Sequence, residues 1–411
     1  MNIRIEKLIE LEKERQLNTA NLIASENIAS QNTLKIQSSV LNYKYVEGYS
    51  GKRYYQGCAI IDKIEELCIY KAQKLFNAKY INVQSHSGSQ ANQAVYIALT
   101  NHKDKILGMS LQSGGHLTHG SKVNFSGKFL DAICYEVDKQ THKINYEQIE
   151  ELAKKHNPKI IIAGFSAYSR KIDFAKFRKI ADKVGAYLLA DISHISGLVA
   201  AGLHENPVNF ADVVTSTTHK TLRGPKGAII FSNHEKIMQK IDKAVFPAVQ
   251  GGAFMHVIAA KAAAFEEALT KEFKIYIENV IENSKALSNS LINRGYDILT
   301  GGSDNHMSII NLTNRNITGK AASLELEKAN IITNMNQIPF DDKPANVSSG
   351  IRIGTAFCTS RNLPKQMFEK IGNLIADALL NLEQKSRYKY QDSISYDIKN
   401  EIISIMNKYP I

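Results

Sequence analysis

The chain has 411 residues, of which 44% are hydrophobic and 22% are charged, and this composition predicts a soluble globular protein with two domains. No run approaches the roughly 18 apolar residues that a membrane span needs, and the charged start MNIRIEKLIELEKERQ has no apolar core of signal-peptide length. The net charge of +11 comes from lysines interspersed with acids, which argues against a nucleic-acid partner and favours small anionic ligands.

The first predicted element is an amphipathic helical arm over residues 3–16, where apolar side chains recur near helical spacing. Beyond about residue 60, short apolar or β-branched runs alternate with helical stretches. The runs are predicted strands, and they cover residues 80–84, 159–165, 186–192, 212–216 and 227–232. Between two of them, residues 173–185 predict a helix with one apolar face that ends at Gly185. This βαβ series predicts an α/β protein with a mostly parallel sheet between two helical layers, a three-layer α-β-α domain.

A smaller domain is predicted at the C-terminal end. Residues 257–294 form a helical stretch without Gly or Pro, and the segments 295–300, 306–313 and 350–355 after it look like strands of an α+β domain. The expected organisation is therefore a helical arm over residues 1–24, a large domain over 25–280 and a small domain over 281–411.

Polar residues follow the predicted strands at their carboxyl ends, where parallel sheets bind ligands. Gly88 and Ser89 lie between a strand and a helix, so backbone N–H groups and hydroxyls there can hold a phosphate at the helix N-terminus. On its own this pattern is also typical of a loop that only caps a helix.

A carboxylate and a lysine stand at two other strand ends. Asp191 closes the apolar strand AYLLADI, where a semi-buried carboxylate needs a cationic partner such as a protonated heterocyclic nitrogen. Capping of the next turn is the alternative. Lys220 follows DVVTSTTH, where partial burial would make its amine a nucleophile for a carbonyl, although a surface lysine is the alternative. Together, a phosphate cradle, a carboxylate and a lysine are what a pyridoxal phosphate enzyme needs.

Metal binding is the competing interpretation of the histidines. His116 and His119 in GGHLTHG, and Asp191 with His194, could be metal ligands, but no H-E-x-x-H occurs and glycines flank the first pair. The four cysteines lie far apart without a C-x-x-C pair, so neither a zinc site nor a disulfide framework is indicated. We therefore expect no metal.

At this point the sequence resembles the serine hydroxymethyltransferases, pyridoxal phosphate enzymes of the aspartate-aminotransferase fold (fold type I), over essentially its whole length. The blocks that carry the resemblance are NLIASEN, KYVEGYSGKRYYQG, NVQSHSGSQAN, GGHLTHG, VNFSGK, GFSAYS, HISGLVAAG, TTHKTLRGP, GGSDNH, SGIRIGT and NKYP. Eleven blocks in family order make the resemblance highly specific.

The resemblance implies roles for the cofactor residues. Lys220 would carry the aldehyde of pyridoxal 5'-phosphate as an aldimine, Asp191 would pair with the pyridine nitrogen, and His116 would stack on the ring. The other implied cofactor contacts are Ser166 and His194 on the ring hydroxyl side, Gly88, Ser89 and His219 at the phosphate, and Tyr45 and Gly252 across a dimer interface.

It also implies the substrate residues. Arg352, aided by Ser25, would hold the substrate carboxylate, because a bidentate guanidinium fixes a carboxylate in one plane. Glu47 and Tyr55 would lie beside the serine hydroxyl, with Glu47 handling the proton. The folate pocket would be lined by Tyr54, Leu111, Gly115, Leu117 and Asn336.

The implied activity is the reversible transfer of the serine hydroxymethyl carbon to tetrahydrofolate, which gives glycine and 5,10-methylenetetrahydrofolate. A homodimer with shared active sites is the implied state, and the scattered cysteines fit a reducing cytoplasm. Several residues depart from the family pattern, mostly on the folate side: Gln112, Ser113, Lys226, Ala253, Asn346 and Phe357. A folate-independent pyridoxal phosphate aldolase or transaldolase acting on glycine or β-hydroxy amino acids is therefore the alternative, and a basic nucleic-acid-binding protein with a vestigial site is a third hypothesis.

Overall fold

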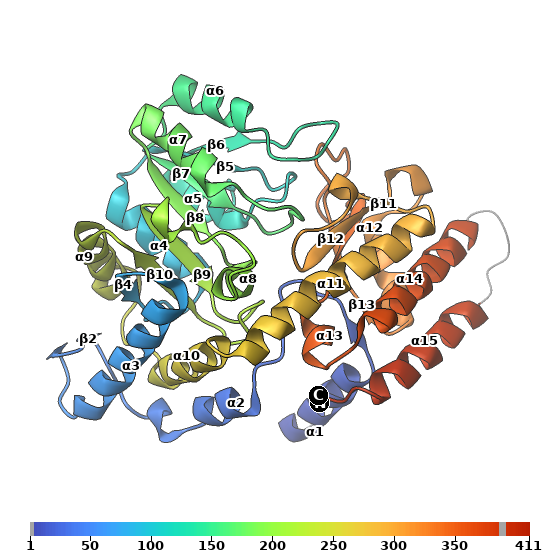
Figure 1. Ribbon diagram of the computed structural model, residues 1–411, viewed down its shortest axis with the longest axis horizontal. Coiled ribbons are helices and arrows are strands. Elements are labelled where there is room, and N and C mark those ends of the chain that lie inside the picture. The colour runs from blue at the N-terminus through green and yellow to red at the C-terminus, as the bar shows by residue number, and fades with distance from the viewer. Residues whose placement is uncertain (1–3, 386–391) are drawn as a thin grey trace. The chain divides into compact units, whose positions relative to one another are not determined.

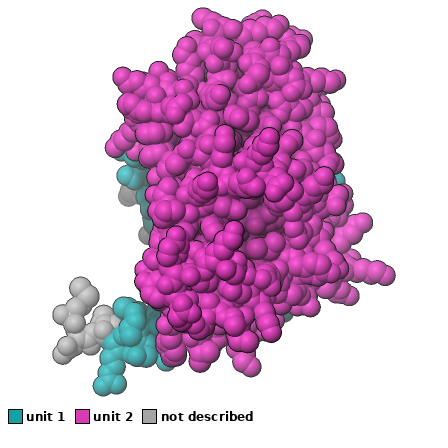
Figure 2. All heavy atoms as spheres, turned by 90° about the vertical axis from the view of Figure 1, so that its left-hand side faces the viewer, with its two compact units in different colours: residues 1–28, 167–170, 278–411 teal, residues 29–166, 171–277 magenta. Residues whose placement is uncertain are grey.

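The computed structural model describes residues 4–385 and 392–411, and the chain forms two compact units (Figure 2). Unit 1 comprises residues 1–28, 167–170 and 278–411, and unit 2 comprises residues 29–166 and 171–277. The bounds that the sequence predicts for an arm and two domains stay a prediction. In the two described ranges, no helix is long and apolar enough to cross a bilayer.

Unit 2 is built on a seven-stranded sheet with the strand order β4-β10-β9-β8-β7-β5-β6 (Figure 1). Its strands are β4 (Tyr80–Asn82), β5 (Lys105–Met109), β6 (Asp131–Tyr135), β7 (Ile160–Gly164), β8 (Tyr187–Asp191), β9 (Val213–Thr217) and β10 (Ala228–Ser232). Neighbouring strands run parallel except where β10 pairs with β4 and β9. β10 is reversed because a loop of ten residues, too short for a crossover helix, joins it to β9. The predicted mostly parallel sheet is confirmed.

Helices cover both faces of this sheet, as the three-layer prediction requires. On one face, Val95 of α4 and Ile241 of α9 pack in one buried cluster with Ile230 of β10. On the other face, the next residue of β10, Phe231, stacks on Phe76 of α3 with 4.9 Å between ring centroids. The helices are α2 (Gln31–Gln37), α3 (Ala59–Phe76), α4 (Gly88–Leu99), α5 (Phe125–Phe129), α6 (Tyr146–His156), α7 (Phe174–Val184), α8 (Ser196–Ala200), α9 (Glu235–Lys243) and α10 (Met255–Ala268). Shorter elements of unit 2 are η1 (Val40–Asn42), β2 (Gly48–Tyr49), β3 (Lys52–Arg53), η2 (Leu117–His119), η3 (Pro207–Asn209) and η4 (Ala244–Val249).

The predicted helical stretch over residues 257–294 is wrong in one respect, because it is two helices, α10 and α11 (Lys271–Asn293). The chain breaks at Leu269 and Thr270. Thr270 supplies the reason, since its hydroxyl donates to the carbonyl of Glu267 at 2.7 Å and accepts from the N–H of Phe273 at 3.2 Å. A threonine that bonds the backbone on both sides ends one helix and starts the next.

Unit 1 contains a four-stranded antiparallel sheet with the order β11-β12-β15-β14 and an apolar core beneath it. Its strands are β11 (Asp297–Ile298), β12 (Met307–Asn311), β14 (Asn334–Asn336) and β15 (Gly350–Gly354), and a separate parallel pair joins β1 (Ala20–Asn21) to β13 (Ile331–Ile332). The predicted smaller α+β fold is present. The other elements are α1 (Ile5–Leu17), η5 (Leu299–Gly301), η6 (Thr313–Arg315), α12 (Gly319–Lys328), α13 (Ala356–Ser360), α14 (Lys365–Lys385) and α15 (Asp392–Asn407).

Candidate active site

The carboxyl ends of five strands meet at one edge of the unit 2 sheet. β5, β7, β8 and β9 are parallel, and β4 has the same direction because two antiparallel pairings through β10 separate it from β9. The segments after these strands carry most of the predicted cofactor residues. These are Gly88 and Ser89 after β4, His116 after β5, Ser166 after β7, Asp191 at the end of β8 with His194 after it, and His219 and Lys220 after β9.

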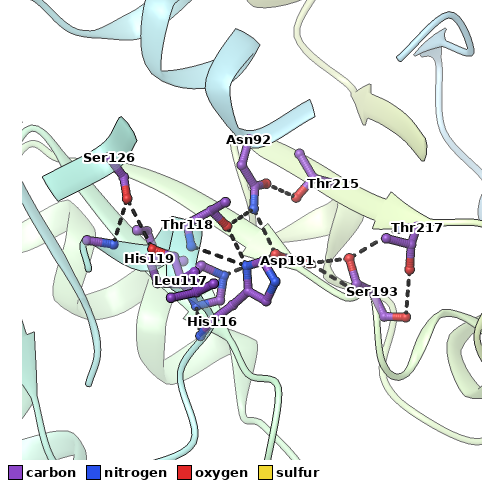
Figure 3. Close-up of polar contacts among 12 residues, drawn as sticks. Asn92, His116, Leu117, Thr118, His119, Ser126, Asp191, Ser193, Thr215 and Thr217 are labelled. Atoms are coloured by element: carbon purple, nitrogen blue, oxygen red, sulfur yellow. Dashed lines mark hydrogen bonds and ion pairs between the residues drawn. The ribbon is translucent and has the colours of Figure 1, made fainter. Parts of the chain in front are cut away.

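Asp191 is the centre of a hydrogen-bond network at this edge (Figure 3). Its Oδ2 accepts from Asn92 Nδ2 at 2.9 Å and contacts His119 Nε2 at 3.0 Å. Its Oδ1 accepts from the N–H of Ser193 at 3.1 Å and from the Ser193 hydroxyl at 2.6 Å. The carboxylate is thus fixed by three side chains and one backbone group.

His119 donates to Asp191 rather than accepting from it. The N–H of His116 donates to His119 Nδ1 at 3.2 Å, so the ring proton of His119 lies on Nε2 and faces the carboxylate. Burial alone would raise the pKa of Asp191, but the hydrogen bond from His119, electrostatic contributions of His119 and His116, and the Ser193 hydroxyl hold that pKa well below its usual range. The structure therefore keeps a buried negative charge ready for a cationic partner.

His116 caps the short helix η2 and is oriented by it. Its Nδ1 lies 2.8 Å from the hydroxyl of Thr118 and accepts from the Thr118 N–H at 3.2 Å. Thr118 is also bonded to Asn92 at 2.8 Å, so the ring orientation of His116 and the position of Asp191 depend on the same amide.

The hydroxyl residues before Lys220 mainly fix the backbone. Thr215 donates to Asn92 Oδ1 at 2.7 Å, and Thr218 donates to the carbonyl of Pro225 at 2.6 Å. Gly224 also donates to the carbonyl of Thr218 at 2.7 Å, which closes the loop. Lys220 is buried, so the interpretation as a surface lysine is wrong.

The loop after β4 begins helix α4 with tight packing. A Cβ on Gly88 would lie 2.7 Å from the Thr217 side chain, so only glycine lets the first turn of α4 approach β9 this closely. Ser87 caps the helix by accepting from the N–H of Gln90 at 3.2 Å. The helix capping that the sequence left as an alternative is therefore present at this turn.

His219 presents a buried nitrogen beside this edge. Its Nδ1 has no hydrogen-bond partner within residues 4–385 and 392–411. Burial, together with the neighbouring charges of Lys220 and Lys226, lowers the pKa of His219 to about 4. A buried ring nitrogen without a partner in the described residues, beside two lysines, is a fitting contact for an anion.

These features fit pyridoxal phosphate. The ionised Asp191 suits a protonated ring nitrogen, the Gly88 turn and the unpartnered His219 nitrogen suit a phosphate, and the buried Lys220 suits the aldehyde.

The predicted residues Tyr45, Glu47 and Gly252 lie together elsewhere in unit 2. A Cβ on Gly252 would lie 2.8 Å from the Val46 carbonyl and 3.4 Å from the Tyr45 ring. Gly252 also connects to the loop after β4, because its carbonyl lies 3.2 Å from His86 Nε2. Tyr45 contacts Tyr55 with 5.1 Å between ring centroids, so Tyr55 belongs to the same loop cluster, and Tyr54 packs against Phe246 at 5.7 Å.

Arg352, Ser25 and Asn336 belong to unit 1. Arg352 lies on β15, is buried, and donates through Nε to Asn334 Oδ1 at 3.2 Å. Burial lowers the pKa of Arg352 to about 10, so the guanidinium stays charged at neutral pH. The segment that ends at Ser25 runs beside β15, since Gly354 donates to the carbonyl of Leu22 at 2.8 Å. Asn336 lies on β14, the strand next to β15.

The residues that depart from the family pattern occupy different environments. Ser113 is buried in the loop after β5 and Gln112 is half-buried beside it. Ala253 is buried next to Gly252, and Phe357 is buried in α13. Asn346 and Lys226 are exposed.

Sequence reasoning missed the residues that hold Asp191. Asn92 lies one turn after Gly88 on α4 and therefore faces the same side, which was a usable signal. His119 stood out only as a possible metal ligand. In the described parts of the chain, no group of three or more His, Cys, Asp or Glu residues could hold a metal ion.

Lys261 was also missed. It is buried on α10, and its Nζ donates to the carbonyls of Val83 at 2.7 Å and Ala228 at 2.8 Å. A Cβ on Gly227 would lie 2.6 Å from its Cε, which explains the glycine after Lys226. Lys261 thus joins the chain after β4 to the start of β10.

Comparison with known proteins agrees with this geometry. A sequence profile described as serine hydroxymethyltransferase matches residues 1–375. A probable serine hydroxymethyltransferase of Rickettsia bellii is 55% identical over 407 residues, which cover 98% of this chain and 96% of that protein. Serine hydroxymethyltransferases of Rickettsia typhi and Rickettsia felis are each 57% identical, over 94% and 92% of this chain and 93% and 90% of their own lengths.

Proposed function

The chain belongs to the serine hydroxymethyltransferase family, and from this premise we propose how its residues share the work of the reaction. The enzyme transfers the hydroxymethyl carbon of serine reversibly to tetrahydrofolate, and pyridoxal phosphate is its cofactor. The observation that carries the residue assignment is the buried, ionised Asp191 at the strand edge that also bears Lys220.

When bound, pyridoxal phosphate supplies an aldehyde carbon for the amine and a protonated ring that accepts the electron pair left on the α-carbon as the Cα–Cβ bond breaks. We assign Asp191 to hold that ring nitrogen protonated, because a carboxylate with a low pKa stabilises a neighbouring cation. His119 and Asn92 keep the carboxylate in place. Lys220 provides the amine that holds the aldehyde between turnovers.

The remaining cofactor contacts follow the same edge. His116 covers one face of the ring with its own orientation set by Thr118. Gly88, Ser89 and His219 hold the phosphate, supported by the helix N-terminus of α4 and the unpartnered His219 nitrogen. Ser166 and His194 contact the ring hydroxyl side.

Substrate binding is assigned to charged and hydroxyl residues. Arg352 holds the serine carboxylate with Ser25, since a buried guanidinium gains most from a bidentate anionic partner. Glu47 accepts or returns the hydroxyl proton of serine, and Tyr55 orients that hydroxyl. The folate pocket is assigned to five residues: Tyr54, Leu111, Gly115, Leu117 and Asn336.

We also propose a homodimer with shared active sites in a reducing cytoplasm. Tyr45 and Gly252 are assigned to the phosphate of the partner subunit's cofactor. The loop cluster that includes Tyr45 is rich in exposed aromatic side chains, and Tyr54 is 75% exposed in the single chain. The four cysteines are free thiols, which supports a reducing compartment.

A spectroscopic experiment tests the folate assignment against the folate-independent aldolase. Purified protein loaded with pyridoxal phosphate is mixed with glycine, with and without tetrahydrofolate, and the long-wavelength absorbance that reports a stabilised α-carbanion is recorded. We expect tetrahydrofolate to enhance that absorbance and to accelerate serine cleavage. If it changes neither, the aldolase is the better description.

A further inference from the structure

The loop over residues 110–115 connects β5 to η2 and carries Leu111 and Gly115, which are assigned to the folate pocket. It contains no helix or strand, so hydrogen bonds determine its shape. A Cβ on Gly115 would lie 2.0 Å from the carbonyl of Met109, so the loop folds back on the end of β5.

Glu136, just after the edge strand β6, holds this loop through two hydroxyls. Its Oε2 accepts from the Ser110 hydroxyl at 2.5 Å and makes a short hydrogen bond with the Ser113 hydroxyl. The Ser110 oxygen accepts from the N–H of Ser113 at 3.1 Å, and the Ser113 oxygen accepts from the N–H of Val137 at 3.2 Å. One carboxylate oxygen therefore joins two loop residues to the strand edge.

The network is directional. An ionised carboxylate only accepts, so both serine hydroxyls donate to Glu136 and leave their oxygens for backbone N–H groups. Hydrogen bonds to a charged acceptor are stronger than neutral ones, and Ser113 is only 2% exposed. Loss of the carboxylate would leave buried hydroxyls unsatisfied, so the loop would rearrange.

The loop also borders a cavity of about 1040 Å³, whose lining includes Leu111, Gln112, His116 and Glu136. Leu111 lies in the loop and Leu117 just after it, and their side chains are 41% and 45% exposed. Two exposed leucines near His116, which is assigned to the cofactor ring, offer an apolar surface to a flat ligand.

We propose that Glu136 is a positioning residue for tetrahydrofolate, which holds the loop over residues 110–115 so that Leu111 and Leu117 receive the pterin. This inference rests on the proposed function. It also assigns a role to Ser113, one of the residues that depart from the family pattern: the altered loop is held by Glu136 and still binds folate.

The test compares Glu136→Ala, Glu136→Gln and Ser113→Ala with a control, Glu151→Gln, which changes an exposed carboxylate on α6. Each full-length protein is loaded with pyridoxal phosphate. Two reactions are measured: serine cleavage with varied tetrahydrofolate, and cleavage of 3-phenylserine, a β-hydroxy amino acid that needs no folate. Thermal unfolding of each variant is recorded in parallel.

Glu136→Ala is expected to raise the KM for tetrahydrofolate about tenfold, because one charge-assisted hydrogen bond is lost. The kcat and the rate of 3-phenylserine cleavage should stay within about twofold of wild type. Glu136→Gln keeps one acceptor oxygen and should recover most of the affinity. Ser113→Ala should shift KM in the same direction, and Glu151→Gln should not.

An unchanged KM for tetrahydrofolate in Glu136→Ala overturns the proposal, and so does an equal loss in both reactions. Should Glu136→Ala fail to fold, an unchanged KM in Ser113→Ala overturns it instead. These results differ from a failure of the proposed function, in which wild-type serine cleavage itself would not respond to tetrahydrofolate.

Discussion

The pH dependence of His219 gives the sharpest prediction about the cofactor-free protein. Burial lowers its pKa to about 4 from 6.5, and Lys220 and Lys226 act in the same direction. In the folded protein the imidazole stays neutral while the unfolded chain binds a proton below pH 6.5. Stability from this group is therefore complete above pH 6.5 and is lost as the pH falls through about 4. At about 1.4 kcal/mol per pH unit, the loss is about 3 kcal/mol.

The assay compares wild type with His219→Asn, stripped of cofactor, between pH 4 and pH 7.5. The Tm of wild type should fall relative to that of the variant by several degrees across this range, because only wild type carries the buried imidazole. Selective isotope labelling of histidine, with the variant for assignment, follows the His219 resonance directly. A bound phosphate should move that titration to higher pH, since a dianion favours the protonated ring. An apo-protein resonance that titrates near 6.5, or parallel Tm curves, would show that the His219 ring is not held neutral by burial.

Substitutions at three further residues give additional tests. Lys220→Ala should retain pyridoxal phosphate through its phosphate and ring contacts, as measured by absorbance after gel filtration. Its turnover should fall about 10³-fold or more, and near-normal turnover would contradict the role of the amine. Arg352→Ala should raise the KM for serine roughly 30-fold or more while Arg352→Lys recovers part of it, and an unchanged KM would remove the carboxylate assignment. Lys261→Met should lower the Tm by leaving the carbonyls of Val83 and Ala228 unpaired. Burial lowers the pKa of Lys261 to about 8, so on raising the pH the folded protein loses this proton before the unfolded chain does. The Tm advantage of wild type over the variant should therefore grow from pH 8 to pH 10. A constant difference in Tm would show that Lys261 does not titrate in this range.

The sheet was predictable where strands are continuous apolar runs. β7, β8 and β10 are buried on both faces and mostly apolar, and β9 is also buried although only Val213 and Val214 in it are apolar. β5 and β6 were not identified, because β6 is an edge strand whose Asp131 and Cys134 are exposed, and β5 begins with the exposed Lys105. Local pattern alone does not separate such strands from loops.

The reactive residues of the site were easier to predict from the sequence than the residues that hold them in place. Asp191 and Lys220 stand at strand ends that the sequence marks, so their types and spacing indicate a cofactor. The partners Asn92 and His119 come from positions 99 and 72 residues away in the chain. Such contacts arise when the strands of the sheet pack together, and the local periodicity of apolar residues does not predict them. Glu136 was missed for the same reason, because its role depends on the neighbouring position of β5 and β6.

The most direct measurement of the central claim follows the transferred carbon. Serine labelled with ¹³C at its β-carbon is incubated with the purified, pyridoxal phosphate-loaded protein and tetrahydrofolate, and the product is observed by NMR. We expect the label to appear in the methylene group of 5,10-methylenetetrahydrofolate as glycine forms, and Lys220→Ala to abolish this transfer. Label that stays in serine, or that is released as free formaldehyde at a rate independent of tetrahydrofolate, would contradict this claim.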